Sequence, residues 1–511
     1  METSTLILSI LAAGICLYYF ALSKLSHFKK MGILHERPLP FLGNMTSVIL
    51  QRTAIMIKIQ RLYNLFPRTK YFGLYDLMTP VIVIRDPDLI NTIAIKNFDN
   101  FCDHRAFLNE ELDPLVSKNL FNIRGDHWRE MRKLLSPTFT SSKMKIMFKL
   151  MVQCAENLST HVANESGETG KTYDVKDLLS RYANDVVATC AFGISVNSFK
   201  DKNNEFFLLG KEAMNFDSSL STKMFINRNC PKLSKYLRLK VFSSKVENFF
   251  KSIVTETVKV RDEKGIHRPD MIQLMMETRN KSDGPLFDIN EMTAQAFVFF
   301  LAGFDSVSTA MCFFVHEVGA NPDVQRKLKE EIDDVLRETN GKPTYEAING
   351  MKYLDAAFNE TLRLYPLAAF LDRICVKEYE LPPATPDAKP IKVKPGQSIW
   401  FPSYALHRDS TYYPNPDKFD PDRFLNGEVD NSVYIPFGIG PRICIGNRFA
   451  IMEAKIMMFY LLWHCELEPD VKTVIPMVLN KRTFIMMAEG GFWMKIRARK
   501  PMASVTSNGE N

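Results

Sequence analysis

The chain has 511 residues, of which 46% are hydrophobic and 24% charged, an ordinary composition for a globular protein. The formal net charge is +7, but basic and acidic residues are interleaved, which argues against a nucleic-acid-binding protein. Nine cysteines without a CxxC pair argue against a disulfide framework or a zinc ribbon. Length alone suggests about three domains. No repeat or Gly/Ser-rich linker follows residue 45, so we predict one globular unit, residues 46–500, and a polar tail, residues 501–511.

Residues 1–23 are predicted to form a transmembrane anchor. Residues 3–23 carry no charge and are largely apolar, and about 20 such residues at 1.5 Å each span a hydrocarbon core of roughly 30 Å. A cleaved signal peptide is the alternative, but it would begin with basic residues, and Glu2 is acidic.

Residues 24–45 are predicted to be a basic, proline-rich linker. Its charges and its stiffening prolines are Lys24, Lys29, Lys30, Arg37, Pro38 and Pro40. Because these positive charges follow the anchor, we expect the globular unit on the cytoplasmic side of the membrane.

Residues 288–321 read as one long helix that ends before Pro322. Asp288 suits the N-cap position, and Glu291, three residues later, would complete a capping box. Four apolar side chains recur at i, i+3, i+4 and i+7 and share one face: Phe297, Phe300, Leu301 and Phe304. Core packing explains most of that face.

The middle of this helix contains residues that core packing does not explain. Gly303 costs a helix about 1 kcal/mol relative to alanine. Asp305 and Ser306 place an acid and an alcohol inside an apolar helix, where each needs a partner or a purpose.

A second helix ends at Pro366 and carries an acid and a base three residues apart. Its apolar stripe comprises Leu354, Phe358, Leu362 and Tyr365. Glu360 and Arg363 can meet on its surface. A surface ion pair, contributing at most about 1 kcal/mol, is the simplest interpretation.

The most informative segment is the glycine-spaced loop of residues 436–446, which contains Cys444 and precedes a helical pattern. Glycines at 438, 440 and 446 let the backbone turn and bring amide groups to the sulfur, and a helix N-terminus adds positive potential. We expect both effects to lower the pKa of the thiol and favour the metal-ligating thiolate. A buried structural cysteine is the alternative.

This loop resembles the haem-binding loop of the cytochrome P-450 enzymes. The pattern is carried by Phe437, Gly440, Arg442, Cys444 and Gly446. The resemblance implies a mainly α fold with small β-sheets (α+β), a triangular helical prism around a buried haem b. Cys444 would be the axial iron ligand, and Phe437 and Arg442 would contact the cofactor. Residues 46–500 would then be a single catalytic haem domain of a monooxygenase.

The family resemblance also gives the unusual helix centre a role. Asp305 would feed protons and Ser306 would guide them by hydrogen bonding during O–O cleavage, while Gly303 leaves room in a widened helix. The alcohol is usually threonine in the family, so Ser306 departs from the pattern. Thr309, one turn further on, is a second hydroxyl that could share this role.

Other segments resemble the supporting parts of the family site. Glu360 and Arg363, with Arg423 in the run 419–424, imply a buried structural triad. Trp128 and Arg132 imply a helix that reaches the haem propionates, together with Arg442. Many relatives have a further base where this chain has Phe370, and His104 or Arg105 could replace it.

The resemblance implies an apolar substrate pocket whose walls include Phe297, Phe300, Leu301, Phe304, Phe370 and Phe484. Runs such as 180–193 and 370–373 place the chain near the microsomal insect detoxification-type branch. The expected substrates are lipophilic xenobiotics such as plant toxins or insecticides. An endogenous terpenoid or fatty acid is the alternative, followed by a haem-thiolate isomerase or dehydratase and by a non-catalytic haem or lipid carrier.

The chain has no dinucleotide-binding fingerprint, so electrons must come from outside. The family implies NADPH, an NADPH-cytochrome reductase and also a microsomal b-type cytochrome as partners, with the anchor in the endoplasmic reticulum membrane. We expect the reductase to dock on a basic face that includes Arg129, Lys133 and Arg448. The other partners are lipid and lipophilic small molecules, with no nucleic acid.

Overall fold

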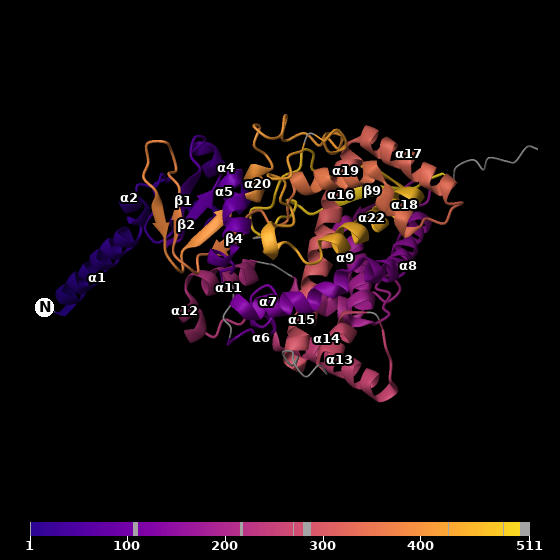
Figure 1. The fold of residues 1–511 in the computed structure, drawn as a ribbon, viewed down its shortest axis with the longest axis horizontal. Coiled ribbons are helices and arrows are strands. Elements are labelled where there is room, and N and C mark those ends of the chain that lie inside the picture. Colours follow the sequence, from indigo (N-terminus) through magenta and orange to yellow (C-terminus); the bar gives the residue numbers. More distant parts are fainter. Residues whose placement is uncertain are drawn as a thin grey trace, which may run out of the picture.

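The structure divides into a β-sheet region beside the N-terminal helix and a larger body of helices (Figure 1). It is a computed structural model that describes residues 2–105, 111–214, 218–268, 270–279, 288–427, 429–483 and 485–500. Helices predominate and the sheets are small, so the predicted mainly α fold is confirmed.

The helices before the central one are short, apart from α1, α8 and α13. They are α1 (Glu2–Lys24), α2 (His27–Met31), α3 (Thr46–Ile49), α4 (Ile55–Leu65), α5 (Pro87–Asn91), α6 (Pro114–Ser117), α7 (Gly125–Leu135), α8 (Ser141–Ser166), α9 (Val175–Val187), α10 (Glu205–Ala213), α11 (Ser218–Asn229), α12 (Pro231–Tyr236), α13 (Ser244–Lys264) and α14 (Met271–Arg279). Short π or 3₁₀ turns lie among them: η1 (Thr92–Lys96), η2 (Phe98–Asn100), η3 (Ser136–Phe139) and η4 (Ala188–Phe192).

The later helices include the central one and the helix that follows the cysteine loop. They are α15 (Ile289–Leu301), α16 (Ser308–Ala320), α17 (Pro322–Glu338), α18 (Tyr345–Gly350), α19 (Lys352–Leu364), α20 (Ser403–Leu406), α21 (Asp422–Leu425) and α22 (Asn447–His464), with the turns η5 (Ala302–Val307) and η6 (Gly440–Arg442).

Three sheets complete the fold. The largest has the strand order β1-β2-β7-β4, with β2 parallel to β7 and the other pairs antiparallel. The others are β3-β9-β8 and β5-β6. The strands are β1 (Tyr71–Asp76), β2 (Thr79–Ile84), β3 (Lys171–Asp174), β4 (Leu371–Ile374), β5 (Tyr379–Leu381), β6 (Ile391–Val393), β7 (Ser398–Phe401), β8 (Cys465–Glu468) and β9 (Trp493–Ala498).

Both faces of the first hairpin are covered, because alternate residues of a strand point to opposite sides. Phe72 and Leu74 join the main core, whereas Tyr71 and Tyr75 join a second cluster with Phe28 of α2. A Cβ at Gly73 would lie 2.5 Å from the Phe28 ring. The segment after the anchor is therefore packed onto this sheet.

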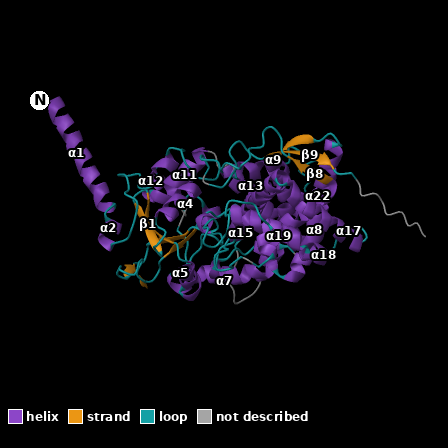
Figure 2. Ribbon diagram, turned by 90° about the horizontal axis from the view of Figure 1, so that it is seen from above, coloured by secondary structure: helices purple, strands orange, loops and turns teal. Residues whose placement is uncertain are grey.

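Helix α1 extends away from the body in both views (Figures 1 and 2). The span Thr3–Met31 is long and apolar enough to cross a membrane, and only 6% of its most apolar window is buried. A second such span, Ile289–Ala320, is 61% buried and is the central core helix. The first span is therefore the candidate anchor.

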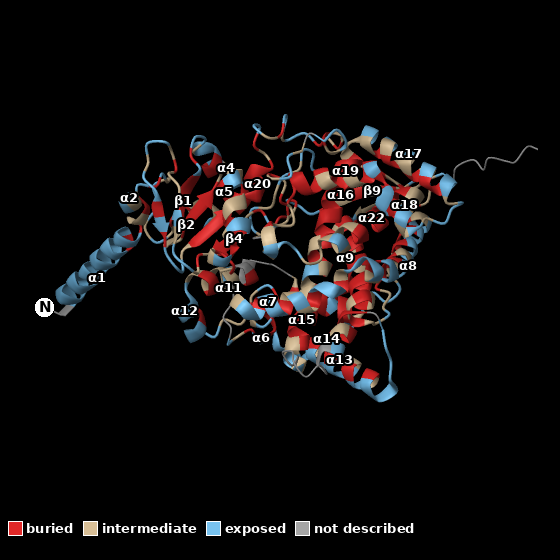
Figure 3. Ribbon diagram, viewed as in Figure 1, coloured by how far each residue is buried: buried red, intermediate tan, exposed pale blue. Residues whose placement is uncertain are grey.

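The central helix runs α15–η5–α16 through the buried interior (Figure 3). The predicted capping box is present: the Asp288 carboxylate accepts from the Glu291 N–H at 2.6 Å, and the Glu291 carboxylate accepts from the Asp288 N–H at 3.4 Å. The helix ends before Pro322 as predicted, but it is interrupted by the π-helical turn η5. This turn contains the unusual central residues.

Candidate active site

The cysteine loop turns where its glycines allow it. Gly438 and Gly440 have φ values of +87° and +73°, a region that residues with a Cβ rarely adopt. A Cβ at Gly440 would also lie 2.1 Å from the Ala94 carbonyl oxygen. The Cys444 N–H donates to the Phe437 carbonyl at 2.8 Å, which closes the loop. The loop thus presents Cys444 just before α22 begins.

Cys444 and Ser306 line the same cavity. The cavity is mostly apolar, with walls that include Phe139, Val187, Phe299, Ala302, Gly303, Val307 and Phe449. The exposed surface of Cys444 opens onto this cavity. The residues at 299, 302, 303 and 306 recur at helical spacing, so one face of the central helix confronts the cysteine.

The pKa of the Cys444 thiol is raised: although its surface is open to the cavity, the surrounding protein separates the sulfur from bulk water, and this desolvation outweighs the opposing effects of the Gly446 N–H and the Arg132 charge. The predicted decrease in pKa is therefore wrong for the free thiol. The predicted amide donor is present, but Gly446 has a φ of −96° and needs no glycine-specific conformation. A metal ion bound at Cys444 would deprotonate the thiol, as it does any coordinating thiol.

Arginines gather beside the loop. Arg442 lies 3.9 Å from the Trp128 ring centroid and donates from Nε to the Cys102 carbonyl at 2.8 Å. Arg132 donates to the Ile443 carbonyl at 2.8 Å. The structure thus brings together the three side chains that the resemblance assigned to the propionates.

Arg373 belongs to this cluster and was not assigned a role from the sequence. It is fully buried in β4, donates to the Ile439 carbonyl at 3.3 Å, and its Nε has no hydrogen-bond partner among the described residues. Burial lowers the pKa of Arg373 to about 10. Burial also lowers the pKa of Arg442 to about 10, and the charge of Arg373 adds to that shift. Only the tertiary fold places these two cations together.

Of the alternatives His104 and Arg105, His104 lies beside the arginine cluster, where the charges of Arg373 and Arg442 act on it, and Arg105 is paired away from it. His104 Nδ1 lies 3.0 Å from the Asp372 carboxylate. The Arg105 guanidinium pairs with Asp76 at 3.1 Å. Arg105 therefore does not fill the position of the expected additional base.

These residues fit a haem. A cysteine sulfur faces an apolar cavity, which suits a planar apolar ring. Arg132, Arg373 and Arg442 offer guanidinium groups to carboxylates, and the orphaned Arg373 Nε is a buried donor without an acceptor in the described chain. Arg442 is paired with Asp103 at 3.3 Å, whereas buried Arg373 has no ion pair within the described residues and would favour a nearby anionic group.

Asp305 and Ser306 point to opposite sides of η5. The Ser306 hydroxyl lies at the Cys444 cavity and donates to the Ala302 carbonyl. The Asp305 carboxylate lines a separate cavity and accepts from Lys176 Nζ at 2.8 Å. Lys176 also donates to Thr309 Oγ1 at 2.6 Å. Thr309 therefore lies on the lysine side, and the prediction that it shares the role of Ser306 is wrong.

Gly303 lines the Cys444 cavity and also lies against Val187 of α9, where there is no room for a side chain. A Cβ at this position would lie 2.6 Å from Val187 Cγ2. Any larger residue would push α9 away from the central helix, so the glycine sets the spacing between the two helices.

The predicted stripe of phenylalanines is core rather than pocket wall. Phe297 and Phe300 are fully buried and pack against Phe250 of α13 at centroid distances of 5.0 and 4.9 Å. Phe304 is also buried and lines the Asp305 cavity, not that of Cys444. Leu301 packs against the same core cluster.

Of the other two predicted pocket residues, the structure describes only Phe370, which does not line the Cys444 cavity. Phe370 stacks on Trp400 at 4.1 Å. Phe484 lies outside the described residues. The face of the central helix that lines the cavity carries Phe299 together with the small residues Ala302, Gly303 and Ser306. Because most of these residues are small, the sequence pattern did not identify this face as a pocket wall.

The charged triad is assembled in the core. Glu360 accepts from Arg363 Nε at 2.7 Å and from Arg423 Nε at 3.1 Å. Glu360 and Arg363 are fully buried and Arg423 is 5% exposed. Glu360 and Arg363 therefore form part of a buried network, not the surface ion pair that was the simplest interpretation of the sequence. None of the three residues lines the Cys444 cavity.

The fold and this site define a haem-thiolate protein, in which a cysteine loop confronts a π-helical turn across an apolar cavity. Comparison with known proteins gives the family. The family model named Cytochrome P450 matches residues 34–495, and the chain belongs to the cytochrome P450 family, the haem-thiolate monooxygenases.

Similar proteins come from insects. Cytochrome P450 9e2 of Blattella germanica is 45% identical over 503 residues, covering 92% of this chain and 94% of that protein. Probable cytochrome P450 9f2 of Drosophila melanogaster is 39% identical, with coverages of 95% and 98%. Cytochrome P450 6j1 of Blattella germanica is 36% identical, with coverages of 96% and 97%. The predicted family and its insect detoxification-type branch are confirmed.

Proposed function

We propose that this enzyme uses NADPH and O2 to oxidise lipophilic xenobiotics, such as plant toxins or insecticides, at a cysteine-ligated haem b. The observation that carries the proposal is the apolar cavity shared by Cys444 and Ser306. The haem would occupy the part of this cavity at Cys444, and the apolar wall on the Ser306 side would favour a lipophilic substrate beside it, because burial of apolar surface is the main favourable term in such a site.

In this proposal Cys444 holds the haem iron, and Trp128, Arg132, Arg373 and Arg442 hold its propionates. The bound haem supplies the oxygen activation that amino-acid side chains cannot supply. The Phe437 ring, half-buried against the core, supports the loop that carries the ligand. Ser306 orients a proton at the cavity wall, and Asp305 exchanges protons on the opposite side of η5.

The full-length protein, reconstituted with haem and an NADPH-cytochrome reductase, tests this function. Lipophilic insecticides and plant toxins are expected to disappear only when NADPH, reductase and O2 are all present, with one ¹⁸O atom from ¹⁸O2 in the product. Consumption restricted to terpenoids or fatty acids in the same panel would show an endogenous role. Loss without NADPH would contradict the proposed reaction.

The reductase is proposed to dock on the cytoplasmic side of the endoplasmic reticulum membrane, with a b-type cytochrome as a second donor. Among the predicted basic residues, Arg129 is paired with Asp99 at 2.5 Å and Arg448 donates to Ser141 at 2.9 Å. Lys133 is exposed and follows Arg132, which contacts the cysteine loop. All three side chains are exposed, and Lys133 is the one for which we name no intramolecular partner, so we choose it for the test.

Lys133→Glu is expected to raise the KM for the reductase at low salt, because it replaces an attractive charge by a repulsive one. The difference should shrink as ionic strength rises toward 1 M, where the Debye length is only about 3 Å. Steady-state turnover over a salt series measures this. Lys259→Glu, at an exposed position of α13, is the control and should leave the KM unchanged. Turnover without any salt dependence would rule out the electrostatic dock.

Ser306→Thr is expected to lower the peroxide released per NADPH consumed. Threonine keeps the hydroxyl and adds a methyl group that restricts χ1, so the hydroxyl is held more firmly at the cavity. Peroxide and NADPH assays on the reconstituted enzyme measure the ratio. Thr309→Ser, on the Lys176 side of the helix, should leave it unchanged. An equal or higher ratio in Ser306→Thr would contradict the expected effect.

A further inference from the structure

A buried amide on the central helix holds the backbone of a loop that is distant in the sequence. Gln295 of α15 is fully buried. Its Nε2 donates to the Lys118 carbonyl at 2.8 Å, and its Oε1 accepts from the Leu120 N–H at 2.8 Å. The side chain thus bonds to the loop as the backbone of a neighbouring strand would. The two bonds fix residues 118–120 against the helix.

Filling space does not account for an amide at this position. A buried polar group costs free energy unless it is hydrogen-bonded. Methionine has a similar length and would fill the same space without this cost. What the amide of Gln295 adds over an apolar side chain is therefore the fixed position of the loop.

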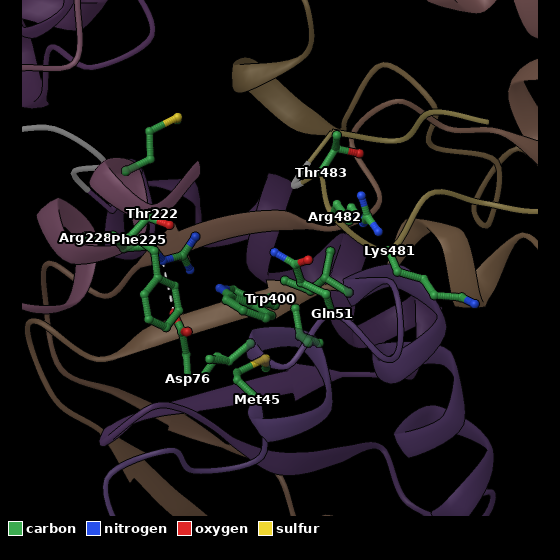
Figure 4. Close-up of a pocket in the computed structure, with 14 residues that line it drawn as sticks. Met45, Gln51, Asp76, Thr222, Phe225, Arg228, Trp400, Lys481, Arg482 and Thr483 are labelled. Carbon is green, nitrogen blue, oxygen red and sulfur yellow. Dashed lines mark ion pairs between the residues drawn. The ribbon is translucent and has the colours of Figure 1, made fainter. Parts of the chain in front are cut away.

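Gln295 is absent from the walls of the spaces in which a ligand could lie. It does not line the Cys444 cavity. It is also not among the residues around Trp400 and Arg228 that line the pocket drawn in Figure 4. An influence of this side chain on the reaction must therefore pass through the loop that it holds.

The held loop leads to the arginine beside the cysteine loop. The Ile123 carbonyl, three residues after Leu120, accepts from Arg442 Nη2 at 3.2 Å. Arg442 also donates from Nε to the Cys102 carbonyl at 2.8 Å. The two carbonyls occupy different nitrogens of one planar guanidinium, so together they set its direction.

The turn between Leu120 and Ile123 is rigid enough to transmit a position. Asn119 is 1% exposed, and its Oδ1 accepts from the Phe121 and Asn122 N–H groups at 3.1 and 3.2 Å. The Ile123 N–H donates to the Asn119 carbonyl at 3.0 Å. A displacement of residues 118–120 would therefore move the Ile123 carbonyl rather than be absorbed between them.

We propose that Gln295 is a positioning residue for the haem, because it holds the loop whose Ile123 carbonyl directs the Arg442 guanidinium toward a haem carboxylate. The proposal rests on the proposed binding of a propionate by Arg442. Reduction adds one negative charge to a haem, and a cation held close by stabilises that charge. Gln295 therefore makes the haem easier to reduce, although it contacts neither the cofactor nor the substrate.

Gln295→Met tests the proposal by potentiometry on the full-length, haem-loaded protein in phosphatidylcholine nanodiscs. The equilibrium constant for one-electron reduction is expected to fall about threefold, a potential about 28 mV more negative. The haem propionate bending band in the resonance Raman spectrum should also shift. If the methionine variant retains too little haem, Gln295→Asn, which keeps a shorter amide, should show a smaller fall in the same direction.

Gln325→Met is the matched control. Gln325 of α17 is 8% exposed and forms the same kind of clamp, since its Nε2 donates to the Leu467 carbonyl at 2.9 Å and its Oε1 accepts from the Leu467 N–H at 2.8 Å. This clamp holds β8 and not the loop that reaches Arg442. The control should lower the urea midpoint about as much as Gln295→Met but leave the potential and the Raman band unchanged.

A double variant tests whether Gln295 acts through Arg442. Lysine keeps the charge of Arg442 but lacks the planar fork that meets two carbonyls. Arg442→Lys should therefore lower the potential by itself. Gln295→Met added to Arg442→Lys should change the reduction constant less than about 1.5-fold further, because residues that act through one contact are not additive.

Four results would overturn the proposal. An unchanged potential in Gln295→Met would show that the loop does not direct Arg442. Equal shifts in Gln295→Met and Gln325→Met would reduce the effect to general loosening of the fold. Additive shifts in the double variant would mean that Gln295 acts by another route. A reduced, unmodified protein whose carbon monoxide spectrum showed no thiolate ligand would contradict the proposed function itself, and this inference with it.

Discussion

Replacing Glu360 by glutamine is expected to destabilise the folded protein by about 3–5 kcal/mol, because two buried guanidinium groups share this carboxylate. Glu360 accepts from Arg363 Nε at 2.7 Å, from Arg363 Nη2 at 2.8 Å and from Arg423 Nε at 3.1 Å. The Asp420 N–H adds a fourth donor at 2.9 Å. Glutamine keeps the shape but removes the charge and turns an amide NH2 toward these donors.

The effect of this change should extend to the cysteine loop through His407. Arg363 Nη1 donates to the His407 carbonyl at 2.7 Å. Burial, together with the charge of Arg363, lowers the pKa of His407 to about 3, so the imidazole stays neutral. Its Nε2 can then accept from the Ile435 N–H at 2.9 Å, directly before the loop 436–446. Glu360→Gln should therefore lose haem faster as well as unfold more easily.

The urea midpoint and the rate of haem loss, both followed by absorbance, measure the two consequences. Glu330→Gln on α17 is the control, since its carboxylate and its partner Arg326 are 61% and 59% exposed. This control should unfold at nearly the same urea concentration as the unmodified protein. If Glu360→Gln matched the control in both measurements, the shared carboxylate would have no stabilising role.

Sequence patterns predicted the parts of the site that a single segment carries. The capping box at Asp288, the end of the central helix before Pro322 and the turn at Cys444 each depend on residues a few positions apart. Such features depend on local hydrogen bonds and on the backbone conformations that each residue type allows, so they can be predicted from a short stretch of sequence.

The parts that depend on packing between segments could not be predicted in the same way. The most apolar stripe, which includes Phe297 and Phe300, faces α13, whereas the cavity face of smaller residues includes Gly303. Apolar periodicity marks a buried face without showing what lies against it. Arg373 is a similar case, because only the pairing of β4 with β7 and the approach of the loop at Ile439 bring it to the site.

The sequence also did not show on which side of the central helix the Asp305 carboxylate lies. This carboxylate belongs to a cavity lined by charged side chains, among them Asp174, Lys176, Asp177 and Lys211. Ser306, the next residue, belongs to the apolar cavity of Cys444. The π-helical turn η5 thus separates a cavity that contains charged as well as apolar side chains from the cavity of Cys444, whose lining has no charged side chain other than the cysteine itself.

Asp305→Asn is expected to lower NADPH-driven turnover about a hundredfold, in the range typical of a lost proton-transfer group. Asparagine can still accept the hydrogen bond that Lys176 Nζ gives at 2.8 Å, so the local fold should survive. It cannot take up and release a proton. The maximal rate should fall with little change in KM, and the solvent deuterium isotope effect should increase.

Asp177→Asn is the matched control for this prediction. Asp177 lines the same cavity as Asp305 and is held by Arg181 at 2.9 Å and Lys211 at 3.0 Å, but it lies on α9 and does not adjoin Ser306. Its turnover and isotope effect should stay close to those of the unmodified enzyme. If both variants slowed equally, the cavity would act through its overall charge. If neither slowed, protons would reach the Cys444 cavity by a route that bypasses Asp305.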